Sequence, residues 1–193
     1  IGSKLVPRLL EQGYRVRCLV RDQKRLATYA WSGSVEVMVG DVLDASTLDL
    51  AFQQVSVVYY LVHSMATPTG DFAELDRQGA RNVGDVARRF GVERLIYLGG
   101  LGKRYLEQSS HLRSRHEVGD VLRESGVPVT EFRAAVIVGA GSFSFEMIHH
   151  LANRLPIMIC PRWVVTRTQP IAVEDVLTYL VIAITSLEST GKV

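Results

Sequence analysis

The sequence has few of the features that mark several well-known classes of protein. It contains only two cysteines among 193 residues, Cys18 and Cys160, and neither belongs to a paired or metal-binding spacing. This argues against a disulfide-stapled scaffold and against a structural zinc site. We therefore expect two reduced thiols in a cytoplasmic-type compartment.

Long apolar runs and a strong excess of one charge are also lacking. The longest apolar stretches, 55–62 and 176–184, fall well short of the roughly 20 residues that a membrane helix needs. The net charge of +2 is too small to favour nucleic acid or an acidic membrane as a partner. The composition is that of an ordinary α/β domain, with 47% hydrophobic and 22% charged residues, and it predicts a packed core.

Segments with strand and helix patterns alternate along the whole chain. The run VVYYLV at 57–62 is apolar throughout, which is typical of a central parallel strand covered on both faces. The alternation predicts an α/β fold, a doubly wound parallel sheet of Rossmann type, formed by residues 1–193 as a single domain. Strands are expected at 15–20, 34–39, 57–62, 93–98 and 127–138, and helices at 1–13, 23–31, 44–54, 71–90, 110–125, 142–155 and 174–187.

The first 22 residues match the second half of a dinucleotide-binding βαβ unit. An amphipathic helix over 1–13 leads through a glycine into a short strand over 15–20. Gly2 is then interpreted as the third glycine of G-x-x-G-x-x-G, which lets helix and strand pack closely. On this interpretation we expect a fragment that lacks the first strand of its fold and a C-terminal part.

In an open parallel sheet, a ligand is expected at the carboxyl ends of the strands. Arg21 lies 19 residues after Gly2, close to the roughly 20 expected for the residue that contacts the ribose. An arginine there suits a 2′-phosphate, because its planar fork binds phosphate oxygens in pairs. The alternative is an ordinary surface pair with Asp22. Asp41 is either a partner for the adenine amino group or a solvent-facing turn residue.

Several segments, in order and spacing, resemble the atypical short-chain dehydrogenase/reductase superfamily, above all its NmrA-like and complex-I-accessory-subunit-like branches. They are IGSKLVPRLLEQGYRVRCLVRD, VGDVLD, YYLVHSM, the long helix with RNV, RLIYLGGLG and FRAAVIVGAGS. The resemblance implies a Rossmann fold with bound NAD(P), and the VRD at the end of the second strand resembles members that prefer NADPH. The cofactor-binding residues expected on these grounds are Gly2, Arg21, Asp41, Val42, Leu61, Val62, His63, Leu98, Gly99 and Gly100.

The sequence departs from this superfamily at its catalytic positions. Catalytic members carry Ser or Thr after the fifth strand and Tyr-x-x-x-Lys on the next helix. Here residues 99–101 are Gly-Gly-Leu, and alignment on Glu117 places His111 at the Tyr position and Arg115 at the Lys position. The spacing keeps both on one helix face. Histidine can move a proton near neutral pH, whereas arginine can hold ribose or phosphate but stays protonated. The alternative is a solvated His/Arg face.

Two weaker patterns also have alternative interpretations. Residues 139–142, Gly-Ala-Gly-Ser, enter a helix and either present backbone N–H groups to an anion or simply cap the helix. His149 and His150 are adjacent, so they point apart on a helix and make a poor metal pair. No metal site is expected.

Two functions therefore remain open. The first is the NAD(P)-binding domain of an oxidoreductase or epimerase-like enzyme with an unidentified small-molecule substrate. The second is a dinucleotide-binding module without turnover, which senses redox state or stabilises a complex with a protein partner. The lost tyrosine and lysine favour the second function, and the retained nucleotide-side residues fit both.

Overall fold

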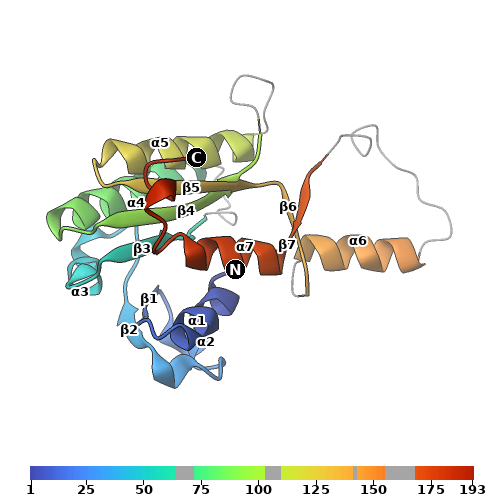
Figure 1. The fold of residues 1–193 in the computed structure, drawn as a ribbon, viewed down its shortest axis with the longest axis horizontal. Coiled ribbons are helices and arrows are strands. Elements are labelled where there is room, and N and C mark those ends of the chain that lie inside the picture. The colour runs from blue at the N-terminus through green and yellow to red at the C-terminus, as the bar shows by residue number, and fades with distance from the viewer. Residues whose placement is uncertain (64–71, 103–109, 141–142, 155–167) are drawn as a thin grey trace.

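The structure is a computed structural model that describes residues 1–63, 72–102, 110–140, 143–154 and 168–193. Helices and strands alternate through this part of the chain (Figure 1). The strands are β1 Arg17–Val20, β2 Glu36–Val39, β3 Val57–Tyr60, β4 Arg94–Gly100, β5 Val129–Ala134, β6 Val136–Val138 and β7 Pro170–Ala172. The helices are α1 Gly2–Glu11, α2 Gln23–Leu26, α3 Asp49–Phe52, α4 Phe72–Arg89, α5 Ser110–Glu124, α6 Phe143–Arg154 and α7 Val173–Ile182.

Every strand pairing in the described chain is parallel, which confirms the predicted α/β class. β1 pairs with β2, β4 lies between β3 and β5, and β6 pairs with β7. The one continuous sheet that the sequence predicts is therefore present as three hydrogen-bonded groups among the described residues. The start of β1 is tied to the end of α3, because Arg17 donates hydrogen bonds from Nη1 to the carbonyls of Ala51 (2.9 Å) and Gln53 (2.8 Å).

Two hydrophobic cores lie on opposite faces of β4, the fully buried strand. Successive side chains of a strand point to opposite faces, so Leu95 packs with residues of α4 and α5, whereas Ile96 packs with residues of α1 and α7. Helices thus cover both faces of the three-stranded group (Figure 1). This is the layer arrangement of a doubly wound fold.

Four elements differ from those that the sequence predicts. The strand predicted over 127–138 is divided into β5 and β6, which pair in different groups. The segment 44–54, predicted as one helix, forms a 3-10 turn at Ala45–Thr47 followed by the short α3. Thr47 Oγ1 donates to the carbonyl of Asp44 at 2.7 Å, and such a local side-chain bond competes with regular helix. The segment 23–31 is helical only over the four residues of α2, and the three residues of β7 carried no recognisable strand pattern.

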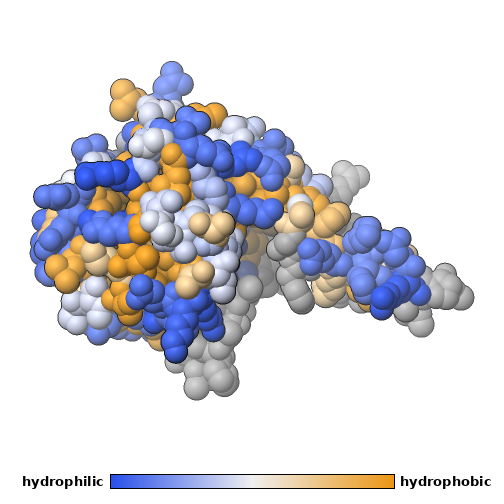
Figure 2. Space-filling model, turned by 90° about the horizontal axis from the view of Figure 1, so that it is seen from below, coloured by the Kyte–Doolittle hydropathy of each residue, from blue (hydrophilic) through white to orange (hydrophobic). Residues whose placement is uncertain are grey.

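Helix α6 extends away from the rest of the molecule beside β6 (Figure 1). Seen from below, the body shows mixed apolar and polar patches, and the described surface of the projecting segment is largely hydrophilic (Figure 2). Phe145, Met147 and Leu151 of α6 are nevertheless exposed. None of the described helices is long and apolar enough to cross a membrane. Cys160 lies outside the described residues.

Candidate functional site

The residues expected to bind a cofactor follow or end the described parallel strands. Arg21 comes directly after β1, and residues 41–42 come after β2. Residues 61–63 follow β3, and residues 98–100 are the last three of β4. Because the carboxyl ends of parallel strands are where an open α/β sheet binds its ligand, this arrangement is consistent with the predicted placement of the site.

Arg21 and its neighbour Asp22 both lie at the surface after β1, as either interpretation of this pair requires. The side chain of Asp22 caps α2 by accepting a hydrogen bond from the backbone N–H of Lys24 at 2.9 Å. The side chain of Arg21 is exposed and has no ion-pair partner among the described residues. The strand end therefore presents an exposed guanidinium group.

The turn after β2 is held by hydrogen bonds within the turn and to α4. The carboxylate of Asp41 accepts from the N–H of Leu43 at 3.0 Å, and Asp41 N–H donates to Thr47 Oγ1 at 3.0 Å. Asn82 Nδ2 donates to the carbonyl of Val42 at 2.8 Å, which ties the turn to α4. Asp41 is thus an ordered turn residue with one carboxylate oxygen directed to its own backbone.

Gly2 lies in the first turn of α1, next to the segment that follows β3. A Cβ added at Gly2 would lie 3.9 Å from Leu61 Cδ1, an ordinary van der Waals distance. Two predicted site residues that are far apart in sequence thus meet in space. The packing of the described residues does not itself require glycine at this position.

Gly100 allows α5 to approach the end of β4 closely. A Cβ at this position would lie 2.6 Å from Leu112 Cδ1 and 3.3 Å from Arg115 Cδ. The strand continues to Gly100, two residues beyond the predicted end. Side chains of α5 therefore occupy the space beside the residues that carry a hydroxyl in catalytic short-chain dehydrogenases.

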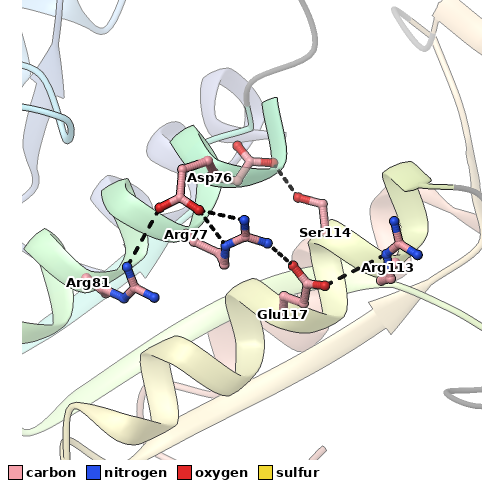
Figure 3. A network of polar contacts seen from close by, with 7 residues as sticks. Asp76, Arg77, Arg81, Arg113, Ser114 and Glu117 are labelled. Atoms are coloured by element: carbon pink, nitrogen blue, oxygen red, sulfur yellow. Dashed lines mark hydrogen bonds and ion pairs between the residues drawn. The ribbon is translucent and has the colours of Figure 1, made fainter. Parts of the chain in front are cut away.

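A buried polar cluster joins the end of β3 to α4 and α5. Nδ1 of His63 lies 3.1 Å from Asp76 Oδ2, and Nε2 of His63 lies 2.7 Å from Nε2 of His111. Ser114 Oγ donates to Asp76 Oδ2 at 3.1 Å (Figure 3). Asp76 is only 3% exposed. The structure thus brings together two histidines that the sequence assigned to different roles.

Asp76 and Ser114 were not predicted from the sequence, although the pattern of α4 carried a signal for Asp76. The buried positions of α4 include Asp76, Ala80, Val83 and Ala87, a helical stripe in which a carboxylate is the exception. An acidic residue on an apolar stripe needs a hydrogen-bonded partner, because burial of an unpaired charge is costly. Ser114 lies three residues after His111 and hence on the same side of α5.

The surroundings of His111 favour its neutral form. Burial lowers the pKa of His111 below its ordinary value of 6.5, and the nearby His63 and Arg115 lower it further, while Asp76 acts in the opposite direction. The rings of His63 and His111 meet edge to face, with centroids 4.5 Å apart.

Arg115 lies beside the end of β4, as the comparison with the lysine position predicts. Its buried Nε has no hydrogen-bond partner among the described residues, and its backbone carbonyl accepts a hydrogen bond from Tyr97 OH at 2.9 Å. The next residue, His116, lies with Nε2 3.0 Å from the carbonyl of Gly100. These contacts fix the orientation of this part of α5 against β4.

An ion-pair network holds α4 and α5 together on the outer side of this cluster (Figure 3). Arg77 Nη1 of α4 donates to Glu117 Oε2 of α5 at 2.5 Å, and Arg77 also pairs with Glu74. Arg113 lies 3.8 Å from Glu117. The network keeps the first turns of α5, which carry His111, next to α4.

The weaker sequence patterns gain no support here. Residues 141–142 of the glycine-rich turn lie outside the described residues. His149 contacts Asn153, with its Nε2 3.1 Å from Asn153 Nδ2. In the part of the chain that the structure describes, no group of His, Cys, Asp and Glu side chains is arranged to hold a metal ion.

Comparison with known proteins agrees with the fold and with dinucleotide binding. A family model described as NAD(P)H-binding matches residues 1–140. The chain is 26% identical over 133 residues to the photosystem II assembly factor Ycf39 of Cyanophora paradoxa, covering 69% of this chain and 41% of that protein. It is 27% identical over 159 residues to a ceramide reductase of Caulobacter vibrioides, covering 82% of this chain and 50% of that protein.

Solved structures share the same architecture. The enzyme WbmG of Bordetella bronchiseptica, crystallised with NAD and UDP, superposes with a TM-score of 0.77 at 20% identity, covering 96% of this chain and 66% of that one. The chain spans half or less of the length of the two curated relatives above. Because the family model covers most of the chain, the chain belongs to the NAD(P)H-binding family, in agreement with its sequence resemblance to the atypical short-chain dehydrogenase/reductase superfamily.

Proposed function

We propose that the chain is the nucleotide-binding domain of an oxidoreductase that prefers NADPH to NADH and acts on a small-molecule substrate. The observation that carries the preference is the exposed guanidinium of Arg21 directly after β1, which forms no ion pair with the described residues. A doubly charged 2′-phosphate gains charge-assisted hydrogen bonds from such a group, and a ribose hydroxyl gains much less. Asp22 is engaged in capping α2, so its carboxylate does not compete for the ribose.

The other strand-end residues have proposed roles that follow from their positions. Asp41 and Val42 line the adenine side, Leu61 and Val62 lie beside the start of α1, and residues 98–100 border the nicotinamide side. A bound nicotinamide supplies or accepts a hydride. The buried Nε of Arg115 has no partner among the described residues, and its proposed role is to donate to a ribose hydroxyl or phosphate oxygen of the cofactor. We place the protein in the cytoplasm on the strength of its cysteine usage.

His63 has a different proposed role from the one that the family resemblance implies. Both of its ring nitrogens already have partners, Asp76 on one side and His111 on the other. No ring nitrogen is left for the cofactor, so any contact between His63 and the dinucleotide involves its backbone.

The test is a comparison of NADPH and NADH affinities for the protein and for its Arg21→Ala variant. The variant loses about 1–3 kcal/mol of NADPH binding, roughly 5- to 150-fold in affinity, because a charge-assisted contact is removed. NADH affinity stays nearly unchanged. Arg88→Ala, which replaces an exposed arginine on α4, serves as control. Equal losses for both cofactors contradict a role for Arg21 at the 2′-phosphate.

The second candidate function is a dinucleotide-binding module without turnover. It is favoured by the close contact of α5 with Gly100, which occupies the neighbourhood of the missing hydroxyl. One relative is named as an assembly factor and another as a reductase. A panel of carbonyl compounds and sugar nucleotides, assayed with NADPH, separates the two. Turnover supports the oxidoreductase, and NADPH binding without any oxidation supports the module.

A further inference from the structure

The protons of the cluster formed by Ser114, Asp76, His63 and His111 can be assigned from its hydrogen bonds. An ionised carboxylate only accepts hydrogen bonds. Asp76 therefore receives a hydrogen bond from Ser114 and another from His63, so Nδ1 of His63 carries a proton. In neutral imidazole the other nitrogen is an acceptor, which makes Nε2 of His63 the acceptor at this end.

The same reasoning determines the tautomer of His111. Its Nε2 lies 2.7 Å from Nε2 of His63, so one of these two nitrogens must donate and the other must accept. With His63 accepting, the proton lies on Nε2 of His111. Nδ1 of His111 is then unprotonated, and it has no hydrogen-bond partner among the described residues.

We propose that Asp76, His63 and His111 form a proton relay in which Nδ1 of His111 takes the proton of a substrate hydroxyl and His63 receives the resulting charge. The inference rests on the proposed function and deepens it. The substrate O–H bond breaks and an N–H bond forms at Nδ1 of His111, while the proton on Nε2 of His111 moves to Nε2 of His63. A bound oxidised nicotinamide dinucleotide would take the hydride from the carbon that bears this hydroxyl, so that the hydroxyl becomes a carbonyl. Reduction runs the same steps in reverse.

The charges around the two rings explain why the relay moves the charge away from His111. A positive charge on His111 is disfavoured by partial burial and by the nearby guanidinium of Arg115. A positive charge on His63 lies next to the buried carboxylate of Asp76, at 3.1 Å from Nδ1. The transfer between the rings therefore moves a charge that the surroundings of His111 disfavour to His63, where it forms an ion pair with Asp76. Asp76 and His63 are positioning residues, and only His111 meets the substrate.

The arrangement also provides a role for the close approach of α4 and α5. His63 follows β3, Asp76 belongs to α4, and His111 begins α5. The ion pair between Arg77 and Glu117 keeps the two helices at the distance at which all three side chains meet. In this superfamily a Tyr-x-x-x-Lys pair on one helix does this work, and here three elements share it.

The test is the tautomeric state of each histidine, read from ring nitrogen chemical shifts in protein labelled on histidine. The chain has five histidines. Substituting them one at a time assigns the ring nitrogen signals to each. Above about pH 7.5, where ordinary histidines are neutral, we expect the proton of His63 on Nδ1 and that of His111 on Nε2. In Asp76→Asn, the proton of His63 should no longer prefer Nδ1, and as a consequence the proton of His111 should no longer prefer Nε2. Asp85→Asn, the same change at an exposed site of α4, should leave both as they are.

The relay is overturned if His111 carries its proton on Nδ1 in the unaltered protein. It is also overturned if Asp76→Asn leaves the tautomer of His111 unchanged. If Asp76→Asn does not fold, His63→Phe replaces it, because this change keeps a ring of similar shape and removes both ring nitrogens. The relay then requires that the proton of His111 no longer prefers Nε2 in this variant. NADPH affinity is measured on the same proteins. The relay variants should bind NADPH as the unaltered protein does, and Arg21→Ala should leave the tautomers unchanged. Failure of the relay is thus distinct from failure of the proposed cofactor preference.

Discussion

The residue that best illustrates how surroundings set chemistry is His111. Burial, His63 and Arg115 all lower its pKa, and the single opposing influence is the carboxylate of Asp76. The ring is therefore a base at neutral pH, ready to accept a proton, rather than a cation. An exposed histidine on the same helix face would divide its time between both forms, so the position in the fold decides the role.

The lowered pKa makes stability depend on pH in a defined direction. The pKa of His111 is lower in the folded protein than its ordinary value of 6.5, so in acid the unfolded chain binds the proton more readily. The stabilising contribution is complete above about pH 6.5 and is lost as the pH falls through the folded pKa. Urea unfolding between about pH 8 and 5 should show a shallower loss of stability for His111→Phe. The exposed His150→Gln is the control, and identical slopes for all three proteins contradict the prediction.

At the level of elements, the decisive contact is that between α5 and the end of β4. Gly100 leaves room for Leu112 and Arg115, and the carbonyl of Gly100 is bonded to His116. A side chain at position 100 would therefore require the end of Leu112 to move. The close contact between α5 and β4 brings the start of α5 to the end of β3, where His111 meets His63.

Gly100→Ser, which restores a hydroxyl of the kind found in catalytic relatives, should destabilise the protein. The added Cβ would lie 2.6 Å from Leu112 Cδ1, the end of a flexible side chain that has to move, and holding such a side chain off its preferred rotamer costs about 0.5–1.5 kcal/mol. Gly33→Ser provides the control, since nothing lies within 4 Å of its added Cβ and a surface change is expected to stay within about 0.5 kcal/mol. Chemical denaturation of both variants checks this. Equal stability of the two variants would show that α5 shifts away at no cost.

For the whole molecule, the central feature is a buried strand that serves two cores. Leu95 and Ile96 are neighbours in β4, both 0% exposed, and each belongs to a different core. Helices α4 and α5 depend on one core, and α1 and α7 depend on the other. Because both cores share β4, loss of either one is expected to affect the entire three-layered unit.

Leu95→Ala and Ile96→Ala should therefore have similar effects and a common unfolding transition. Each removes a fully buried side chain, and such changes cost about 2–5 kcal/mol. Leu187→Ala, at a residue that is 83% exposed, should be nearly neutral. Unfolding is followed by far-ultraviolet circular dichroism and by tyrosine and tryptophan fluorescence. Separate transitions in either core variant would mean that the two layers unfold independently.

Much of the fold could be predicted because its signals are local. Apolar periodicity and stop residues place the strand over 57–62 and the helix over 110–125 within a few residues of β3 and α5. The short β7 could not be predicted, since three residues carry too little periodicity. The broken helix at 44–54 depends on the bond from Thr47 to the carbonyl of Asp44, which competes with a helix that composition alone favours.

The candidate site likewise has one part that the sequence predicts and another that it does not. By itself, the sequence determined the parallel α/β class and the positions of the strand-end residues, such as Arg21, because these follow from the order of the elements along the chain. Only the tertiary structure decided that His63, Asp76 and His111 form one unit. His63 and His111 are separated by 48 positions, and no periodicity relates residues that far apart. They meet because α4 and α5 pack side by side at the end of β3, and contacts between elements are a property of packing rather than of local sequence.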